Sequence, residues 1–220
     1  MKEILSGITE NMKNSKQYLD DLQEASIKAA GKKKNPPQLP QIVEIRRSLH
    51  LYWDEVANFM QVECYQTVNE VACLQDAKEP SQLIGAIKEL EISGKKCSVK
   101  AKALVGQHDA FIRSFTARNI RFQGSDGIIA RFTQACGALR AGLIDLFGLI
   151  EKQRQACAAY QTTASTNYNP AMLVEITRIG KQWKLYAVNT RETYTHIHKL
   201  SEDMKQPMIS KGGKGGCIIM

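Results

Sequence analysis

Residues 83–122 read LIGAIKELEISGKKCSVKAKALVGQHDAFIRSFTARNIRF, and this stretch decides the fold. Steps of alternately four and three residues connect one line of positions from its first residue to its last. The line is made of Leu83, Ile87, Leu90, Gly94, Cys97, Ala101, Leu104, His108, Phe111, Phe115, Arg118 and Phe122. A spacing sustained over this length is typical of helices that pack side by side. We therefore expect a long helix, with a bend or break at Ser93-Gly94, because glycine costs about 1 kcal/mol in a helix interior.

The sequence on both sides of this stretch predicts further helices. Amphipathic patterns cover residues 1–30, 41–77 and 170–203, and an apolar segment opens another helix that runs from Ile128 to about Thr166. Residues that interrupt helices separate these segments: Gly31 with the prolines of 36–40, Pro80, the turn 123–127, and Asn169-Pro170 as cap and first residue of the last helix. No segment alternates with a period of two, so no strand is expected.

These patterns predict an all-α protein, a bundle of four to five long amphipathic helices with a flexible C-terminal tail. Residues 1–203 form the single domain, with a loop at 31–41, and residues 204–220 form the basic, glycine-rich tail. With 220 residues, of which 43% are hydrophobic and 24% charged, the chain is long enough to bury a core of ordinary size.

Charge and cysteine content narrow the class of protein. The formal net charge of +8 suits an anionic partner, either phospholipid or nucleic acid. The first twenty residues contain no continuous apolar run of the kind found in a signal peptide. The six cysteines show no metal-binding spacing, and we interpret five of them as reduced core residues. These features favour a protein of the cytosol.

The tail, Ser210-Lys-Gly-Gly-Lys-Gly-Gly-Cys217-Ile-Ile-Met220, carries the most specific signal. A cysteine followed by two aliphatic residues and a terminal methionine is the pattern for farnesylation of that cysteine. The four glycines favour the extended, accessible peptide that a prenyltransferase needs. We expect farnesylation at Cys217, followed by removal of the last three residues and methylation. The simpler alternative is a free cysteine in an unstructured tail.

One lipid chain seldom anchors a protein stably, so a second membrane signal is expected. Lysines near an anionic leaflet contribute about 1 kcal/mol each. The lysines predicted to contact anionic membrane lipids are Lys199, Lys205, Lys211, Lys214, Lys32, Lys33 and Lys34. The last three have a plainer interpretation as a solvated loop.

Residues 128–150 are either a core helix or a segment that enters lipid after rearrangement. Arg131, Arg140 and Asp145 would cost about 8 to 10 kcal/mol near a bilayer centre, more than the roughly 5 kcal/mol that the apolar residues return. The segment is therefore not expected to span a membrane, and its nearly continuous apolar surface favours a buried, central helix. The candidate core or membrane-interacting residues are Ile128, Ile129, Leu139, Leu143, Ile144, Leu146, Phe147, Leu149 and Ile150.

The sequence contains little that favours catalysis. No nucleophile motif, phosphate-binding loop or dinucleotide fingerprint is present. His196 and His198 are two residues apart and face different sides of a helix, so no metal site is expected. His108 lies on the apolar line and is expected to be buried and neutral. No catalytic residue, cofactor or metal is predicted, and nucleic acid is an unlikely partner because Phe115 and Phe122, between the arginines near 113–131, lie on the packing line.

We therefore expect a non-enzymatic, prenyl-anchored helical bundle at the cytoplasmic face of a membrane, or at a host cell membrane if the protein is a secreted effector. It would act as an adaptor or membrane-shaping module, with a second copy or another helical protein as partner. Two alternatives remain at this point: a membrane-permeabilising bundle that uses residues 128–150, and a helical nucleic-acid-binding protein.

Overall fold

The structure, a computed structural model, describes residues 1–31, 36–166 and 170–205. These residues form five helical rods and no strand, as predicted. The rods are α1 (Lys2–Ala30), a composite rod, α4 (Pro80–Ala117), α5 (Ser125–Thr166) and α6 (Pro170–Lys205). The composite rod consists of α2 (Leu39–Phe59), a π-helical turn η1 (Met60–Cys64), α3 (Tyr65–Cys73) and a 3-10 turn η2 (Leu74–Asp76).

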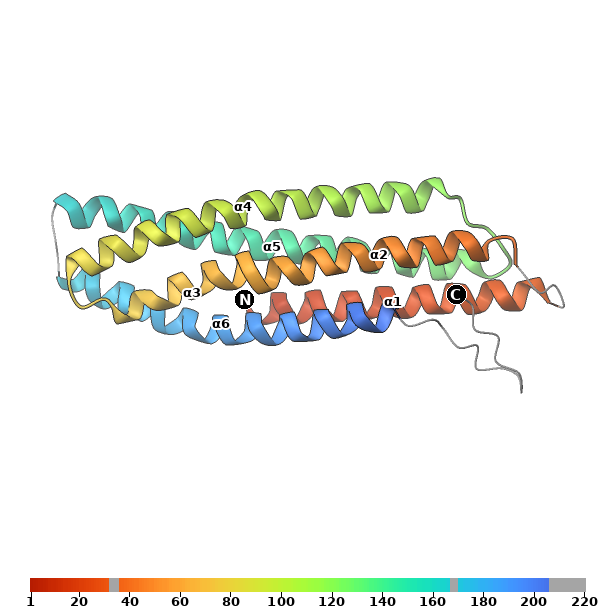
Figure 1. Ribbon diagram of the computed structural model, residues 1–220, viewed down its shortest axis with the longest axis horizontal. Coiled ribbons are helices and arrows are strands. Elements are labelled where there is room, and N and C mark those ends of the chain that lie inside the picture. The colour runs from red at the N-terminus through yellow and green to blue at the C-terminus, as the bar shows by residue number, and fades with distance from the viewer. Residues whose placement is uncertain (32–35, 167–169, 206–220) are drawn as a thin grey trace.

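Consecutive rods run antiparallel and form one elongated bundle (Figure 1). Helix α5 packs against α1 on one side and α4 on the other, whereas α6 packs against the composite rod and α1. Helix α1 begins near the middle of the long axis and runs to one end (Figure 1). It therefore covers only part of α5 (Figure 1).

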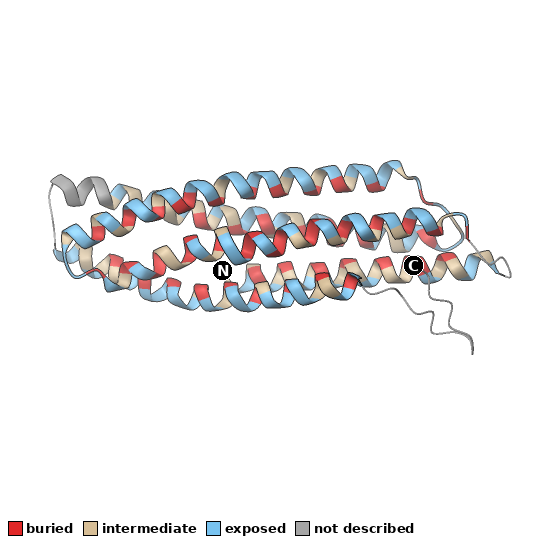
Figure 2. Cartoon of the chain, viewed as in Figure 1, coloured by how far each residue is buried: buried red, intermediate tan, exposed pale blue. Residues whose placement is uncertain are grey.

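The line of positions that predicts α4 is the buried face of that helix up to Phe115. Figure 2 shows the same pattern in every rod, with buried residues on the inner faces and exposed residues outside. The last two predicted positions are wrong, because α4 ends at Ala117 and leaves Arg118 and Phe122 only half-buried in the connection. Asn119 adopts a left-handed conformation with φ of 46°, which asparagine tolerates better than most residues and which cannot continue a helix. Ile120 is buried in their place.

The composite rod differs from the uninterrupted helix predicted for residues 41–77. It starts two residues earlier, at Leu39, and it contains a π-helical turn. Such a turn holds more residues than a turn of α-helix. Phe59, Met60 and Cys64 are all buried around this turn. A π-turn shifts the helix face relative to the sequence, so both Phe59 and its neighbour Met60 reach the core.

One further predicted boundary is wrong: α5 begins at Ser125, inside the predicted turn 123–127 and three residues before Ile128. The Ser125 hydroxyl accepts a hydrogen bond from the Phe122 backbone N–H at 3.1 Å, which favours this earlier start. The remaining boundaries are confirmed where the structure describes them. Gly31 closes α1 with φ of 58°, and Pro80 and Pro170 are the first residues of α4 and α6. The predicted cap Asn169 lies outside the described residues. One cysteine assignment is wrong: Cys73 is exposed, whereas the core cysteines are Cys64, Cys97, Cys136 and Cys157.

Candidate functional site: a groove between α4 and α5 with a basic rim

Most of the predicted membrane-contact residues lie outside the described residues. This applies to Cys217, Lys211, Lys214, Lys32, Lys33 and Lys34. The two described members, Lys199 and Lys205, are exposed on α6. Lys205 forms an ion pair with Glu202, which lies one turn before it and compensates its charge.

The nine candidate residues of 128–150 divide between the core and the surface. Leu139, Leu143, Leu146 and Ile150 are buried, whereas Ile144 is 41% exposed. The remaining four, Ile128, Ile129, Phe147 and Leu149, are half-buried. The expectation of a helix enclosed on all sides is therefore wrong, because small residues and Ile144 face solvent. Among the described residues, no helix combines the length and apolarity needed to cross a membrane.

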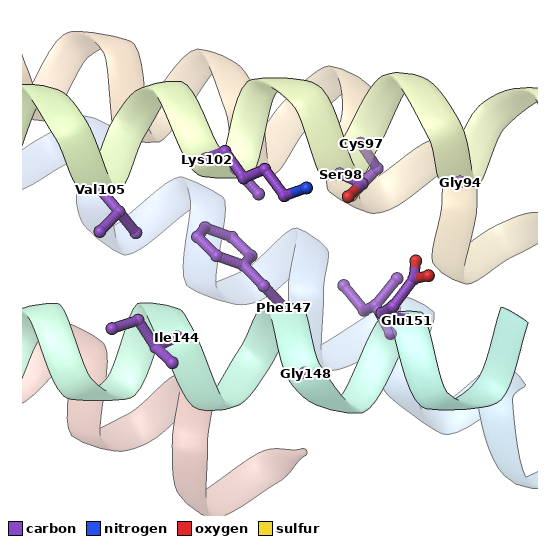
Figure 3. A pocket seen from close by; sticks show the side chains of 11 residues that line it. Gly94, Cys97, Ser98, Lys102, Val105, Ile144, Phe147, Gly148 and Glu151 are labelled. Atoms are coloured by element: carbon purple, nitrogen blue, oxygen red, sulfur yellow. The ribbon is translucent and has the colours of Figure 1, made fainter. Parts of the chain in front are cut away.

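A groove lies where α4 and α5 run side by side, and several of its lining residues are small. Gly94, Ser98 and Ala101 on α4 and Gly148 on α5 all line this groove. The groove has a volume of about 410 Å³. Side chains of both helices point into it (Figure 3). Its other lining residues are Cys97, Lys102, Val105, Ile144, Phe147, Ile150 and Glu151.

The floor and walls of this groove are apolar and fixed by packing. Cys97 and Ile150 are buried at the floor. Phe147 forms one wall, and its ring meets that of Phe59 edge-to-face with 5.2 Å between centroids. Such aromatic pairs hold a ring in one orientation, so this wall is pre-formed.

An arginine closes one end of the groove. Arg154 of α5 donates hydrogen bonds to Glu91 of α4 at 2.5 Å and to Glu151 at 2.6 and 2.9 Å. The pKa of Glu151 lies below its usual range, first because of these hydrogen bonds and to a smaller extent because Lys102 is near. The arginine side chain lies over Gly94, where an added Cβ would be 2.3 Å from Arg154 Cδ. Gly94 therefore makes room for Arg154, and α4 continues through Ser93-Gly94 without the predicted break.

Lysines line the exposed side of α4 next to the groove. Lys95, Lys96, Lys100 and Lys102 are all exposed within two helical turns, together with Val99, which is 69% exposed. Helix α4 contains six Lys or Arg residues and three Asp or Glu residues, whereas the composite rod, residues 39–76, contains two and six. The positive charge of the described residues is thus uneven, and α4 carries its densest part. We call these four lysines the basic rim.

No family model, curated protein or solved structure matches this chain.

Sequence reasoning missed the basic rim, although the signal was present. The four lysines of 95–102 lie on the side of α4 opposite the apolar line, so their common exposure follows from the same periodicity. The groove left no such signal. It depends on residues of α4 and α5 that are distant in sequence and come together only in the bundle.

A second polar cluster lies inside the bundle, where side chains of four rods meet. The rings of Tyr52 on the composite rod and His108 on α4 pack edge-to-face at 5.3 Å. Ser15 of α1 lies 3.7 Å from the Cys136 sulfur of α5. Among the described residues, the Tyr52 hydroxyl and both ring nitrogens of His108 have no hydrogen-bond partner of good geometry. His108 is buried as predicted, with 1% of its surface exposed.

Burial keeps this cluster uncharged, which argues against acid–base or nucleophilic chemistry. It raises the pKa of Tyr52 and raises that of Cys136 to about 12. Burial also lowers the pKa of His108 to about 4, an effect that Asp109 partly opposes and Arg140 reinforces. A thiol and a phenol that stay protonated are poor nucleophiles. The described residues also contain no group of three or more metal-binding side chains.

The low pKa of His108 predicts that the protein loses stability in mild acid. Its folded-state pKa of about 4 lies below the ordinary 6.5, so the unfolded chain binds the proton more readily. The stability contribution is complete above pH 6.5 and is lost as the pH falls from 6.5 toward 4. Between pH 7.5 and 5 the free energy of unfolding should fall by about 2 kcal/mol from this residue.

Urea denaturation of the wild type and of His108→Phe at both pH values measures this contribution. The phenylalanine variant should fold and lose most of the pH dependence. An equal decrease in both proteins would contradict the assignment to His108.

Of the four arginines considered for nucleic-acid binding, Arg118 and Arg131 contact other side chains of the bundle, whereas Arg113 and Arg121 are exposed. Arg118 pairs with Glu44, and the Arg131 guanidinium lies 5.4 Å from the ring centre of Tyr18. Phe115 is buried and packs against Phe132, so it offers no face for base stacking.

Proposed function

We propose that this protein is a non-enzymatic helical bundle held at the cytoplasmic face of an anionic membrane by a prenyl group on Cys217. The observation that carries the proposal is the order Cys217-Ile-Ile-Met220, which has the composition of a farnesylation site. At the membrane, the bundle acts as an adaptor or membrane-shaping module. Exposed apolar side chains on its outer faces, such as Val99, Val174 and Leu185, offer contacts for a helical partner or a second copy.

The basic rim supports this proposal as the second membrane signal. Its lysines lie on one side of a rigid helix, so they can approach a flat anionic surface together. Ile92 and Val99 are exposed on the same helix and supply apolar contacts of the kind that interfacial helices use. A prenyl group and a row of lysines are each weak anchors, and their free energies add.

The proposal predicts that Cys217→Ser makes the protein diffuse in the cytosol of a eukaryotic cell without unfolding it.

It also predicts that Lys95, Lys96 and Lys100→Gln leaves the lipid in place and weakens binding to phosphatidylserine vesicles by up to about a hundredfold, at about 1 kcal/mol per lysine. Intact-mass analysis of the N-terminally tagged protein reports the lipid, and vesicle sedimentation reports the affinity.

A matched variant tests whether the rim or the overall charge matters. Lys2, Lys13 and Lys28→Gln removes the same charge from exposed positions of α1 and should weaken vesicle binding far less. A wild-type mass without lipid, or membrane retention of Cys217→Ser, would refute prenyl anchoring. Equal losses in the two lysine variants would refute the role of the rim.

A further inference from the structure

The groove between α4 and α5 combines an apolar interior with a positive charge at its edge. The interior is formed by Cys97, Ala101, Val105, Ile144 and Phe147, and the charge is that of Lys102. In Figure 3 the Lys102 side chain extends over the groove from α4. A shape of this kind fits a ligand with one apolar chain and one negatively charged end.

Among the charged side chains that line the groove, Lys102 is the one that can bind the anionic head group of a ligand. Glu151, the acidic lining residue, accepts hydrogen bonds from both Arg154 and Gln155, and Arg154 also pairs with Glu91, so one guanidinium serves two carboxylates. Lys102 makes no salt bridge with the residues that the structure describes, whereas Lys95 pairs with Glu91. The five positive charges near this part of the groove still outnumber the two carboxylates; they are those of Lys95, Lys96, Lys100, Lys102 and Arg154, against Glu91 and Glu151. Charge complementarity therefore favours an anion over a neutral or cationic ligand.

The volume of the groove sets the size of the chain. If each carbon of an alkyl chain takes about the volume of one water molecule, about 30 Å³, then 410 Å³ holds about 13 or 14 carbons. The walls are already in place, because Phe147 is held by Phe59 and the end is closed by Arg154. A pre-formed site loses little affinity to ordering on binding.

We infer that this groove binds a single-chain anionic lipid, a fatty-acid carboxylate of about 14 carbons, with the chain between α4 and α5 and the carboxylate at Lys102. This inference goes beyond the proposed membrane anchoring and does not depend on Cys217. It makes the bundle a carrier or sensor of free fatty acid in addition to a membrane-bound module.

The test uses delipidated Cys217→Ser protein made in bacteria, so prenylation plays no part, and myristate below its micellar concentration as the probe. Isothermal titration should show one site. Shortening the chain by two carbons should weaken binding by about tenfold, since each buried methylene contributes about 0.8 kcal/mol. Extending it beyond about 14 carbons should add little. Myristyl alcohol, which lacks the charge, should bind about two- to fivefold more weakly.

Two substitutions separate the groove from the rest of the surface. Gly148→Leu places a side chain in the groove, and the space around its Cβ is open, so the protein should fold and lose binding by at least tenfold. Gly137→Leu is the matched control on the same helix, exposed and outside the groove, and should bind like the wild type. Lys102→Gln should reduce binding of myristate and leave that of myristyl alcohol unchanged.

Three results would overturn the inference: no binding of myristate, equal binding by Gly148→Leu and Gly137→Leu, or equal affinity for myristate and its alcohol. Thermal unfolding of each variant confirms that losses of binding do not reflect loss of fold. The prenylation of Cys217 is judged separately by intact mass, so either proposal can fail alone.

Discussion

Replacing Leu143 by alanine is expected to lower the free energy of unfolding by about 2 to 5 kcal/mol. The side chain is completely buried in α5, on the face that packs into the bundle. The substitution removes transfer free energy and leaves a cavity, because helices held along their whole length cannot collapse around it. Urea denaturation followed by circular dichroism measures the change.

Ile144→Ala provides the control at the next position. Ile144 is 41% exposed, so its truncation should lower the free energy of unfolding by only about 1 kcal/mol. An unchanged midpoint for Leu143→Ala would mean that α5 is not packed in solution. That result would favour the membrane-permeabilising alternative for residues 128–150.

The second large effect that we expect is a loss of stability when Gly180 is replaced by alanine. An added Cβ would lie 2.3 Å from the backbone nitrogen of Gln75 and 2.9 Å from its Cα. Since a backbone cannot rotate away as a long side chain can, α6 and the 3-10 turn η2 must separate. Overpacking of this kind costs about 1 to 3 kcal/mol or more, and it outweighs the gain of about 1 kcal/mol in helix propensity.

The opposite sign is expected at a glycine without neighbours. Gly137→Ala in α5 meets nothing within 4 Å, so only the propensity gain remains and the protein should become more stable by up to about 1 kcal/mol. Thermal unfolding of the two variants compares the signs directly. A stabilised Gly180→Ala would show that α6 does not approach η2 this closely.

The sequence predicts which face of each helix is buried much better than which helices are neighbours. Periodicity defines the buried face of α4 because each turn repeats the same choice of apolar or polar side chain. The helix ends at Gly31 and Pro80 were also predictable, because the backbone preferences of glycine and proline act on their own segment of chain. The amino-acid composition does not indicate the π-turn at Met60–Cys64 or the left-handed conformation of Asn119. Neither feature could therefore be predicted from the sequence.

The candidate site divides in the same way. The basic rim follows from the spacing of the four lysines within one helix and was predictable in principle. The groove beside it was not, because its lining residues come from two helices whose relative position the sequence does not show. Cys73 was misassigned for a related reason, since the apolar character of cysteine says little about which side of a helix it occupies.

The pairing of α1 with α5 has a consequence for synthesis on the ribosome. Ser15 and Cys136, which meet in the native protein, are 121 residues apart in the chain. At about 5 to 20 residues per second, translation takes roughly 6 to 25 s to produce the partner surface for the first helix. During this interval the apolar stripe of α1, including Leu5, Ile8 and Met12, emerges without its native cover. We therefore expect chaperones that bind amphipathic segments to act on the nascent chain. Its last steps of folding must wait for α6, which follows α5 and packs against both α1 and the composite rod.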